Sequence, residues 1–375
     1  MKTMRRLIYG EILRAVGFVL LAFIALFSFF DLVDELSALG RVSPFNPELV
    51  YGLQHALWYV TLFTPNRIYE LLPISVLIGT VFVLARLAES SEYTILRTSG
   101  LGPWRALRLL LGLGAVFVVL TFAMGDYVAP WADRQAQLLK AQFKGGISIG
   151  RTGAWLKERD DARQYSVNVG ALQPDGTLEQ VRLFEFTPEG RLLSTTQAQR
   201  GRIVATDGRT HWALAQVQRH IFHTQAASTA YIETQALPQY DWPTHISADM
   251  VSVALLKPDR MRTLDLFTCI QHLQANNQNA QSYAIEFWRK VFYPLSCLVM
   301  VVLALPFAYL HFRSGGVAAY VFAGVMIGIS FFLLNNVFGY IGNLRQWQPW
   351  LAAASPSLLY SLASLGAFGW LVLKR

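Results

Sequence analysis

Charged residues are scarce in this chain of 375 residues. They make up only 15% of the sequence, whereas apolar residues make up 53%. Soluble domains usually carry about 25% charged residues, so this composition suits a lipid environment. The scarcity of charge predicts an integral membrane protein.

Cysteine is also nearly absent. Cys269 lies outside the long apolar runs and Cys297 lies inside one, so we expect neither a disulfide between them nor a metal site. No G-x-x-x-x-G-K-[ST] string occurs, so the chain has no nucleotide-binding P-loop. Any step driven by nucleotide hydrolysis must therefore come from a partner, and we expect no cofactor in this chain.

Two strings match patterns of catalytic or metal sites. Ser148 sits in a G-x-S-x-G string, but a nucleophile elbow needs a strand before it and a helix after it, and the order here is the reverse. His220 and His223 are three residues apart, so on a strand they point to opposite faces and cannot share an ion. The sequence therefore favours a protein that is not an enzyme.

Six apolar runs are long enough to cross a membrane, which takes about 20 residues. They are Leu7–Phe30, whose uncharged part is Ala15–Phe30, a stretch that ends at Leu87, then Leu109–Met124, Val291–Leu310, Gly315–Gly342 and Trp350–Leu373. Pro65 and Pro73 predict kinks in the second run, because proline lacks a backbone donor. No small-residue cleavage site closes the first run, so we expect an uncleaved anchor. The order predicts three spans, a large soluble domain and three more spans.

Lysine and arginine near the ends of the spans predict the orientation, because these residues concentrate on the cytoplasmic side. Ten of them lie on the side of the N-terminus and two on the other. The ten are Lys2, Arg5, Arg6, Arg86, Arg97, Arg105, Arg108, Arg313, Lys374 and Arg375, and the two are Arg41 and Arg345. Both termini are therefore expected in the cytoplasm and the large domain outside it. The net charge of +8 follows from this asymmetry and from a basic outer domain, and it implies no nucleic acid.

The spans themselves contain few ionisable residues, each of which costs about 2.5 to 3.5 kcal/mol on insertion scales. They are Glu11, Arg14, Asp31, Arg67 and Glu70. None forms an obvious proton relay, which argues against a proton-coupled transporter.

The outer domain is punctuated by turn signals at 174–176, 188–190 and 206–208, with segments rich in branched and aromatic residues between them. This pattern predicts an all-β sandwich or an open barrel. Its edge can accept a strand from another protein, and its inner face can hold a lipid; the sequence leaves both uses open, as it does a plain packed domain. Residues Pro258–Arg289 are expected to form a polar helical connector.

The segment Leu84–Gly100 is polar and lies between two apolar spans. Drawn as a helix, it has a charged side with Arg86, Glu89, Tyr93 and Arg97, with Leu96 beside them, and a more apolar side with Leu84, Leu87, Ala88, Ser91, Ile95 and Thr98. Ser90 or Ser91 can cap a short helix, Glu92 then lies in its first turn, and Gly100 can end it. Tyrosine and leucine among charges suit a socket on another protein. A solvated linker is the alternative.

Four strings in this order resemble the lipopolysaccharide export permeases of the LptF/LptG family. They are LARLAESSEYTILRTSGLGPWRAL before the third span, GDYVAP at 125–130, FWRKVFYPLSCLVMVVLALPF at the fourth and NNVFGYIGNL late in the fifth. The short tail after the sixth span is more similar to LptG than to LptF. The resemblance covers nearly the whole chain.

The resemblance implies an α-helical polytopic membrane protein with six transmembrane helices in a 3+3 layout and an inserted all-β periplasmic β-jellyroll domain. Residues 1–125 would form the first three spans with a cytoplasmic coupling helix near 86–99, residues 126–280 the periplasmic domain with its helical connectors, and residues 281–375 the last three spans.

The resemblance also implies the permease subunit of an ABC transporter that extracts lipopolysaccharide from the bacterial inner membrane and passes it to a periplasmic protein bridge. The implied partners are an LptF-like permease subunit, an LptB-like ATPase dimer that binds ATP and Mg, and LptC- and LptA-like periplasmic proteins. Glu92 matches the acidic residue that the family places in its coupling helix. Helix geometry adds Arg86, Glu89, Tyr93, Leu96 and Arg97 to this ATPase contact.

An exported amphiphile needs apolar contacts for its acyl chains and cations for its phosphates. The candidates for acyl contacts are Phe23, Phe27, Phe30, Phe331 and Leu334, and those for phosphate contacts are Arg41, Arg67, Arg134, Lys140 and Arg345. Lysines that some family members carry at the outer end of the first span are replaced here by Asp31, Ser37 and Ala38.

Gly324 and Gly328 form a small-xxx-small pattern, which is expected to mark the interface with the partner permease. Three other hypotheses remain: a membrane-anchored scaffold whose β-domain recruits periplasmic partners without transport, a secondary transporter, and a membrane hydrolase that uses Ser148. The spans lack the features of a secondary transporter, broken-helix symmetry and a central ionisable site.

Overall fold

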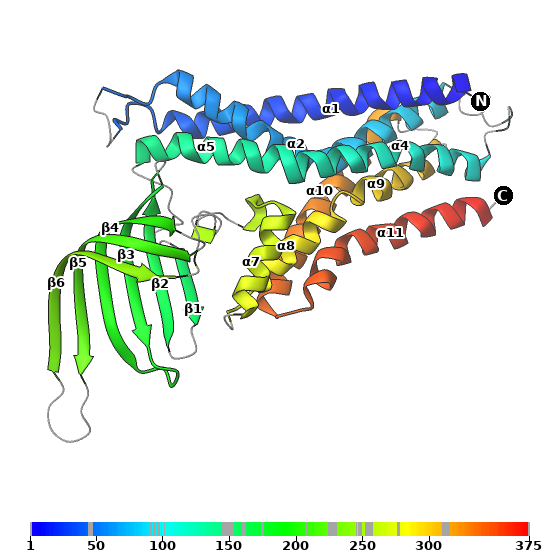
Figure 1. Cartoon of the computed structure of the whole chain (residues 1–375). Helices are drawn as coiled ribbons and strands as arrows, with labels where there is room; N and C mark the ends of the chain where they lie inside the picture. Colours follow the sequence, from blue (N-terminus) through cyan, green and yellow to red (C-terminus); the bar gives the residue numbers. More distant parts are fainter. Residues whose placement is uncertain are drawn as a thin grey trace. The chain divides into compact units, whose positions relative to one another are not determined.

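The computed structural model describes residues 2–43, 48–90, 92, 95, 98, 100, 102–144, 154–159, 163–173, 176–206, 209–223, 231–244, 246, 250–251, 258–275, 278–309 and 316–373. They form two compact units (Figure 1). The first unit contains Met1–Asp34, Val60–Ala132 and Gln281–Arg375, and the second contains Glu35–Tyr59 and Asp133–Ala280.

Long helices dominate the first unit, because a chain in lipid must satisfy its backbone hydrogen bonds internally. Its helices are α1 (Lys2–Leu36), α2 (Leu53–Glu89), α4 (Pro103–Ala123), η1 (Met124–Val128), α5 (Ala129–Lys144), α8 (Gln281–Phe292), α9 (Ser296–Ala304), η3 (Leu305–Ala308), α10 (Gly316–Leu344) and α11 (Pro349–Leu373), of which α1, α2 and α5 continue into the second unit. Within the described residues, five helices are long and apolar enough to cross a membrane, and a bent pair brings the number to six. The predicted polytopic membrane protein is confirmed.

The region of the fourth predicted span, Val291–Leu310, is a bent pair of helices. The amphipathic helix α8 begins at Gln281, and the chain then turns by 47° and continues as α9 and η3. Pro294 lies in the turn between α8 and α9 and explains the break, because proline cannot donate the helical hydrogen bond. The sequence assigned the polar stretch before Lys290 to a helical connector, and this stretch is helical in the structure.

Small residues let the helices of the first unit approach closely. A Cβ atom on Gly79 of α2 would lie 2.7 Å from the backbone nitrogen of Val16 in α1, and one on Gly114 of α4 would lie 2.9 Å from the Leu298 side chain in α9. Many large apolar side chains point outward instead, such as Phe18, which is 74% exposed. This pattern suits a helical bundle whose outer surface faces lipid.

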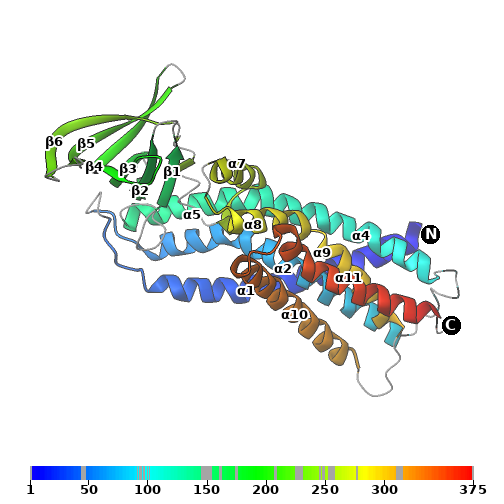
Figure 2. The same ribbon diagram turned by 90° about the horizontal axis from the view of Figure 1, so that it is seen from below.

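The second unit contains one antiparallel sheet of six strands, each paired with the next in sequence (Figures 1 and 2). The strands are β1 (Ala154–Arg159), β2 (Gln164–Leu172), β3 (Thr177–Phe186), β4 (Leu192–Thr206), β5 (Arg209–His223) and β6 (Tyr231–Pro243). The predicted turn at 188–190 joins β3 to β4, and Gly190 has the positive φ of 85° that such a turn needs. The inserted all-β domain is confirmed, and the described strands form one sheet, as the open-barrel alternative requires.

One face of the sheet carries the apolar core of this unit. Leu156, Val167 and Leu183 face each other across β1, β2 and β3 and are buried. Trp212 and Trp242 meet edge to face at 5.4 Å, and the Trp212 indole donates a hydrogen bond to the Ile246 carbonyl. The opposite face is mostly polar. The unit also contains the short turn η2 (Pro258–Arg260) and the helix α7 (Thr263–Ala275).

Candidate functional site

The end of α2 carries the start of the predicted coupling segment. Leu84 and Leu87 are buried, whereas Arg86 and Glu89 are exposed, which is the division of faces that the helical pattern predicts. Arg86 Nη2 lies 2.6 Å from Glu11 Oε2 and so ties α2 to α1.

The rest of the coupling segment is only partly described. Glu92 is helical and exposed, and Gly100 has a positive φ of 101°, as expected for a glycine that ends a helix. Ile95, assigned to the apolar side, is 63% exposed. Tyr93, Leu96 and Arg97 lie outside the described residues, and so does Ser148. The coupling role of this segment stays a prediction.

Arg67 of α2, a candidate phosphate ligand, is already paired. Its guanidinium makes a two-bond contact with Asp31 of α1, at 2.6 and 3.0 Å, and lies 3.4 Å from Glu70. The rings of Phe27 and Phe63 lie on it at 5.2 and 5.0 Å. Two carboxylates therefore neutralise this arginine, and its contact with a lipid phosphate stays a prediction.

Lys140 is paired in a similar way in the second unit. Its ammonium lies 2.9 Å from the buried carboxylate of Glu35 and 3.8 Å from the centre of the Tyr59 ring. The Tyr51 hydroxyl donates to the other Glu35 oxygen, and burial together with that carboxylate raises the pKa of Tyr51 above its usual range. The cluster joins the end of α1 to α5, so Lys140 acts as a structural cation in this structure.

The other predicted cations differ from these two. Arg41, Arg134 and Arg345 are exposed, and none of the three has an ion-pair partner among the described residues. They remain the predicted contacts that a phosphate group can reach without displacing a carboxylate.

Of the predicted acyl contacts, those on α1 are accessible and one on α10 is not. Phe30 is 54% exposed, and Phe23 and Phe27 are half-buried. Phe331 is only 1% exposed and packs edge to face on Tyr360, with Tyr293 on another side. Phe331 is therefore a core residue, and its contact with an acyl chain stays a prediction. Leu334 is half-buried.

Gly324 and Gly328 of α10 face α2 of the same chain. A Cβ atom on Gly328 would lie 2.7 Å from Ile74 Cγ2, and one on Gly324 would lie 3.7 Å from Val81. The small-residue pattern therefore serves a contact within the chain, and its part in a subunit interface stays a prediction. The sequence cannot reveal which helix covers such a stripe.

A buried polar cluster, which sequence reasoning missed, joins two of the strings that carry the family resemblance. Lys290 of α8 is 6% exposed and donates a hydrogen bond of 2.8 Å to the Gly125 carbonyl. Gly125 lies in the π-helical turn η1, and a Cβ atom there would clash with the Tyr69 ring. A lysine inside a membrane segment is the signal that could have revealed this cluster.

The neighbouring Arg289 joins α8 to the third of these strings. It donates to the Asn335 carbonyl at 3.0 Å and to the Glu286 carboxylate at 2.7 Å. A Cβ atom on Gly339 would clash with its Nη2 atom. Adjacent basic residues thus hold the GDYVAP turn and the helix α10 against α8. GDYVAP and NNVFGYIGNL each supply a backbone carbonyl and a glycine to this contact, and the string at α8 supplies the two basic side chains.

Comparison with known proteins agrees with these features. The family described as "Lipopolysaccharide export system permease LptF/LptG" matches residues 6–373 of this chain. The lipopolysaccharide export system permease protein LptG of Escherichia coli strain K12 is 25% identical over 372 residues, which cover 99% of this chain and 98% of that protein. LptG of Haemophilus influenzae is 24% identical over 360 residues, 96% of each chain.

Proposed function

The chain belongs to the lipopolysaccharide export system permease family LptF/LptG, and on that premise we propose that it is the LptG-like transmembrane subunit of an ABC transporter. It is a multi-pass protein of the inner membrane. Its partners would be an LptF-like permease and an LptB-like ATPase dimer. The transporter would extract lipopolysaccharide and pass it to an LptC- and LptA-like periplasmic bridge.

The observation that supports this proposal most directly is that the last turns of α2 have one buried apolar face and one exposed charged face. Leu84 and Leu87 anchor the helix in the bundle, while Arg86 and Glu89 stay at its surface and lead to the exposed Glu92. A chain without a P-loop needs an external source of energy, and a charged, exposed segment between two spans suits a contact with an ATPase. Because the flanking spans carry most lysines and arginines on this side, we place the segment and both termini in the cytoplasm.

In this orientation residues 126–280 lie in the periplasm. The sheet ends at the strand β6, whose residues are mostly exposed and which pairs on one side with β5 among the described strands. Such an edge can add a strand from a periplasmic partner. A scaffold without transport would use the same edge, but it would leave the charged segment at the end of α2 without a role.

The direct test reverses the charge at Glu92. In the Glu92→Lys variant we expect a folded protein that loses most co-purification with the ATPase and most lipopolysaccharide-stimulated ATP hydrolysis, because a rim charge of the wrong sign opposes docking. Glu189→Lys, an equal change in the exposed β3–β4 turn, is the control and should leave both readouts unchanged. Normal coupling in the Glu92 variant would refute the proposed contact.

Topology is tested separately with a membrane-impermeant thiol reagent. Cysteine introduced at Glu89 should react only after the inner membrane is opened, whereas cysteine introduced at Glu189 should react from the periplasm. The reverse pattern would overturn both the orientation and the mechanism.

A further inference from the structure

The ladder of the sheet is interrupted along one line that crosses five strands. Between β2 and β3, Val169 pairs with Val181 and Ala171 pairs with Glu179. Gly170 and Gln180 lie between these pairs and do not pair. The same gap recurs in each later pair of strands. The residues on this line are Gly170, Gln180, Gln199, Gln216 and Pro238.

Two glutamines on this line have an unusual backbone. Gln180 has a φ of 52° and Gln216 a φ of 55°, in the left-handed region that residues other than glycine rarely adopt. Gly170 is needed beside them, because a Cβ atom there would lie 2.9 Å from Gln180 Cβ. Strained positions of this kind persist only when the surrounding structure holds them, and they concentrate at binding sites.

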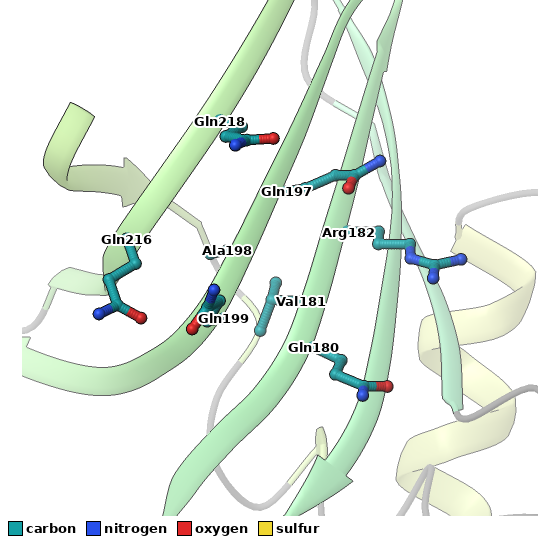
Figure 3. A pocket seen from close by; sticks show the side chains of 8 residues that line it. All are labelled: Gln180, Val181, Arg182, Gln197, Ala198, Gln199, Gln216 and Gln218. Atoms are coloured by element: carbon teal, nitrogen blue, oxygen red, sulfur yellow. The ribbon is translucent and has the colours of Figure 1, made fainter. Parts of the chain in front are cut away.

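A cavity of about 300 Å³ opens on the polar face of the sheet at this line (Figure 3). We call it the amide groove, and its polar side chains come from the three neighbouring strands β3, β4 and β5. They are Gln180, Arg182, Gln197, Gln199, Gln216 and Gln218. All six are exposed, and none has a hydrogen-bond or ion-pair partner among the described residues.

An aromatic pair lies on the same face. Register places Trp155 opposite Asn168, Asn168 opposite Arg182, and Arg182 opposite Gln197, so all four point to one side. Trp155 is 53% exposed and stacks on Phe184 with a centroid distance of 5.9 Å and an interplanar angle of 21°. Phe184 follows Arg182 by two residues on β3, about 7 Å along the strand. The aromatic pair therefore borders the amide groove.

This combination of groups selects among ligand classes. Each glutamine amide offers two donors and an acceptor, which match hydroxyl groups that both donate and accept. An acyl chain would need an apolar lining, and a highly phosphorylated group would need more cations than Arg182. An added peptide strand would need an open edge, whereas the groove lies over central strands. Saccharides fit best, because they offer hydroxyl groups around the ring and C–H groups on its faces.

We propose that this face of the sheet is a binding subsite for a saccharide chain. Trp155 and Phe184 would stack against one sugar ring, and the amide groove would bind the hydroxyl groups of the next. The identity of the saccharide rests on the proposed function: in a lipopolysaccharide exporter it is the sugar part of the exported lipid, which this face would guide while the acyl chains travel elsewhere.

The test uses the full chain purified with its partner subunits. Isothermal titration calorimetry measures binding of the oligosaccharide released from lipopolysaccharide by mild acid, which carries no acyl chains. Trp155→Ala and the double variant Gln197→Ala with Gln218→Ala should each weaken binding about tenfold, the loss expected for one stacking contact or two hydrogen bonds. Trp155→Phe should retain most of the affinity, because it keeps an aromatic face.

Gln271→Ala, which removes an exposed amide from α7 outside the sheet, is the matched control and should bind as the parent does. Equal binding by all variants, or no binding at all, would overturn the subsite. Binding of chitotetraose but not of the lipopolysaccharide oligosaccharide would overturn its assignment to the exported lipid. ATPase co-purification of the same preparations separates these outcomes from failure of the proposed function, because the variants should keep their coupling.

Discussion

Arg67 and Asp31 join α2 to α1 through two hydrogen bonds, from Nη2 to Oδ1 at 2.6 Å and from Nε to Oδ2 at 3.0 Å. The pair lies inside two candidate spans, and its side chains are 24% and 15% exposed. An arginine that is costly in lipid is thus neutralised within the chain.

Removing one partner of this pair should therefore lower the free energy of unfolding more than removing both partners does. We expect Asp31→Ala to lower the free energy of unfolding in detergent by about 2–3 kcal/mol, because it leaves the cation with weaker compensation, and the double variant with Arg67→Ala to recover part of that loss. Thermal unfolding measures this cycle. Arg14→Ala is the control, because Arg14 is 84% exposed and lies 3.8 Å from Glu11, and it should change stability little. Additive losses in the double variant would contradict a direct interaction.

Gly125 should tolerate no side chain. The Gly125→Ala variant places a methyl group against the Tyr69 ring and disturbs the carbonyl that Lys290 binds, so a loss of about 1–3 kcal/mol is expected. Tyr69→Leu in the same chain should restore part of the stability. Gly366→Ala in α11 serves as the control, since no atom lies within 4 Å of its Cβ position. Equal melting temperatures for the two alanine variants would show that the close contact at Gly125 does not restrict the size of the residue there.

The second unit should lose stability in mild acid through His272 of α7. Burial lowers the pKa of this imidazole below its ordinary value of 6.5, with Glu158 and a hydrogen bond to the Lys157 backbone opposing the shift. The unfolded chain therefore binds the proton more readily than the folded chain does. The stability that the neutral imidazole contributes is complete above pH 6.5 and is lost as the pH falls through the folded-state pKa. Between pH 5 and 7, the free energy of unfolding should depend more steeply on pH in the parent protein than in the His272→Gln variant. Equal slopes would exclude His272 as the cause.

Cys269 should react slowly with thiol reagents at neutral pH. Burial raises the pKa of its thiol to about 11, and the thiolate is the reactive form. In a Cys297→Ala background, the rate of maleimide labelling should rise roughly tenfold per pH unit through the neutral range and should stay far below that of a cysteine introduced at Glu189. Fast labelling at pH 7 would show that the helix α7 opens readily.

Local patterns predicted much of the architecture. The long apolar runs identified the spans, because lipid imposes the same length and composition on any helix that crosses it. The turn residues at 188–190 marked a β-hairpin, because glycine alone adopts the required backbone conformation freely. At the end of α2, alternation of Leu84 and Leu87 with Arg86 and Glu89 predicted which side is buried.

The sequence by itself thus determined that the chain is a membrane protein with an inserted β-domain, because composition and hydrophobic periodicity depend only on residues that are neighbours in the chain. Only the tertiary structure decided which residues meet: Gly328 against Ile74, Phe331 against Tyr360, and Lys290 against the Gly125 carbonyl. It also aligned glutamines from separate strands in one groove. These contacts depend on the rotation of each helix about its axis and on the register of the strands. Long-range packing sets both, and local periodicity does not encode them.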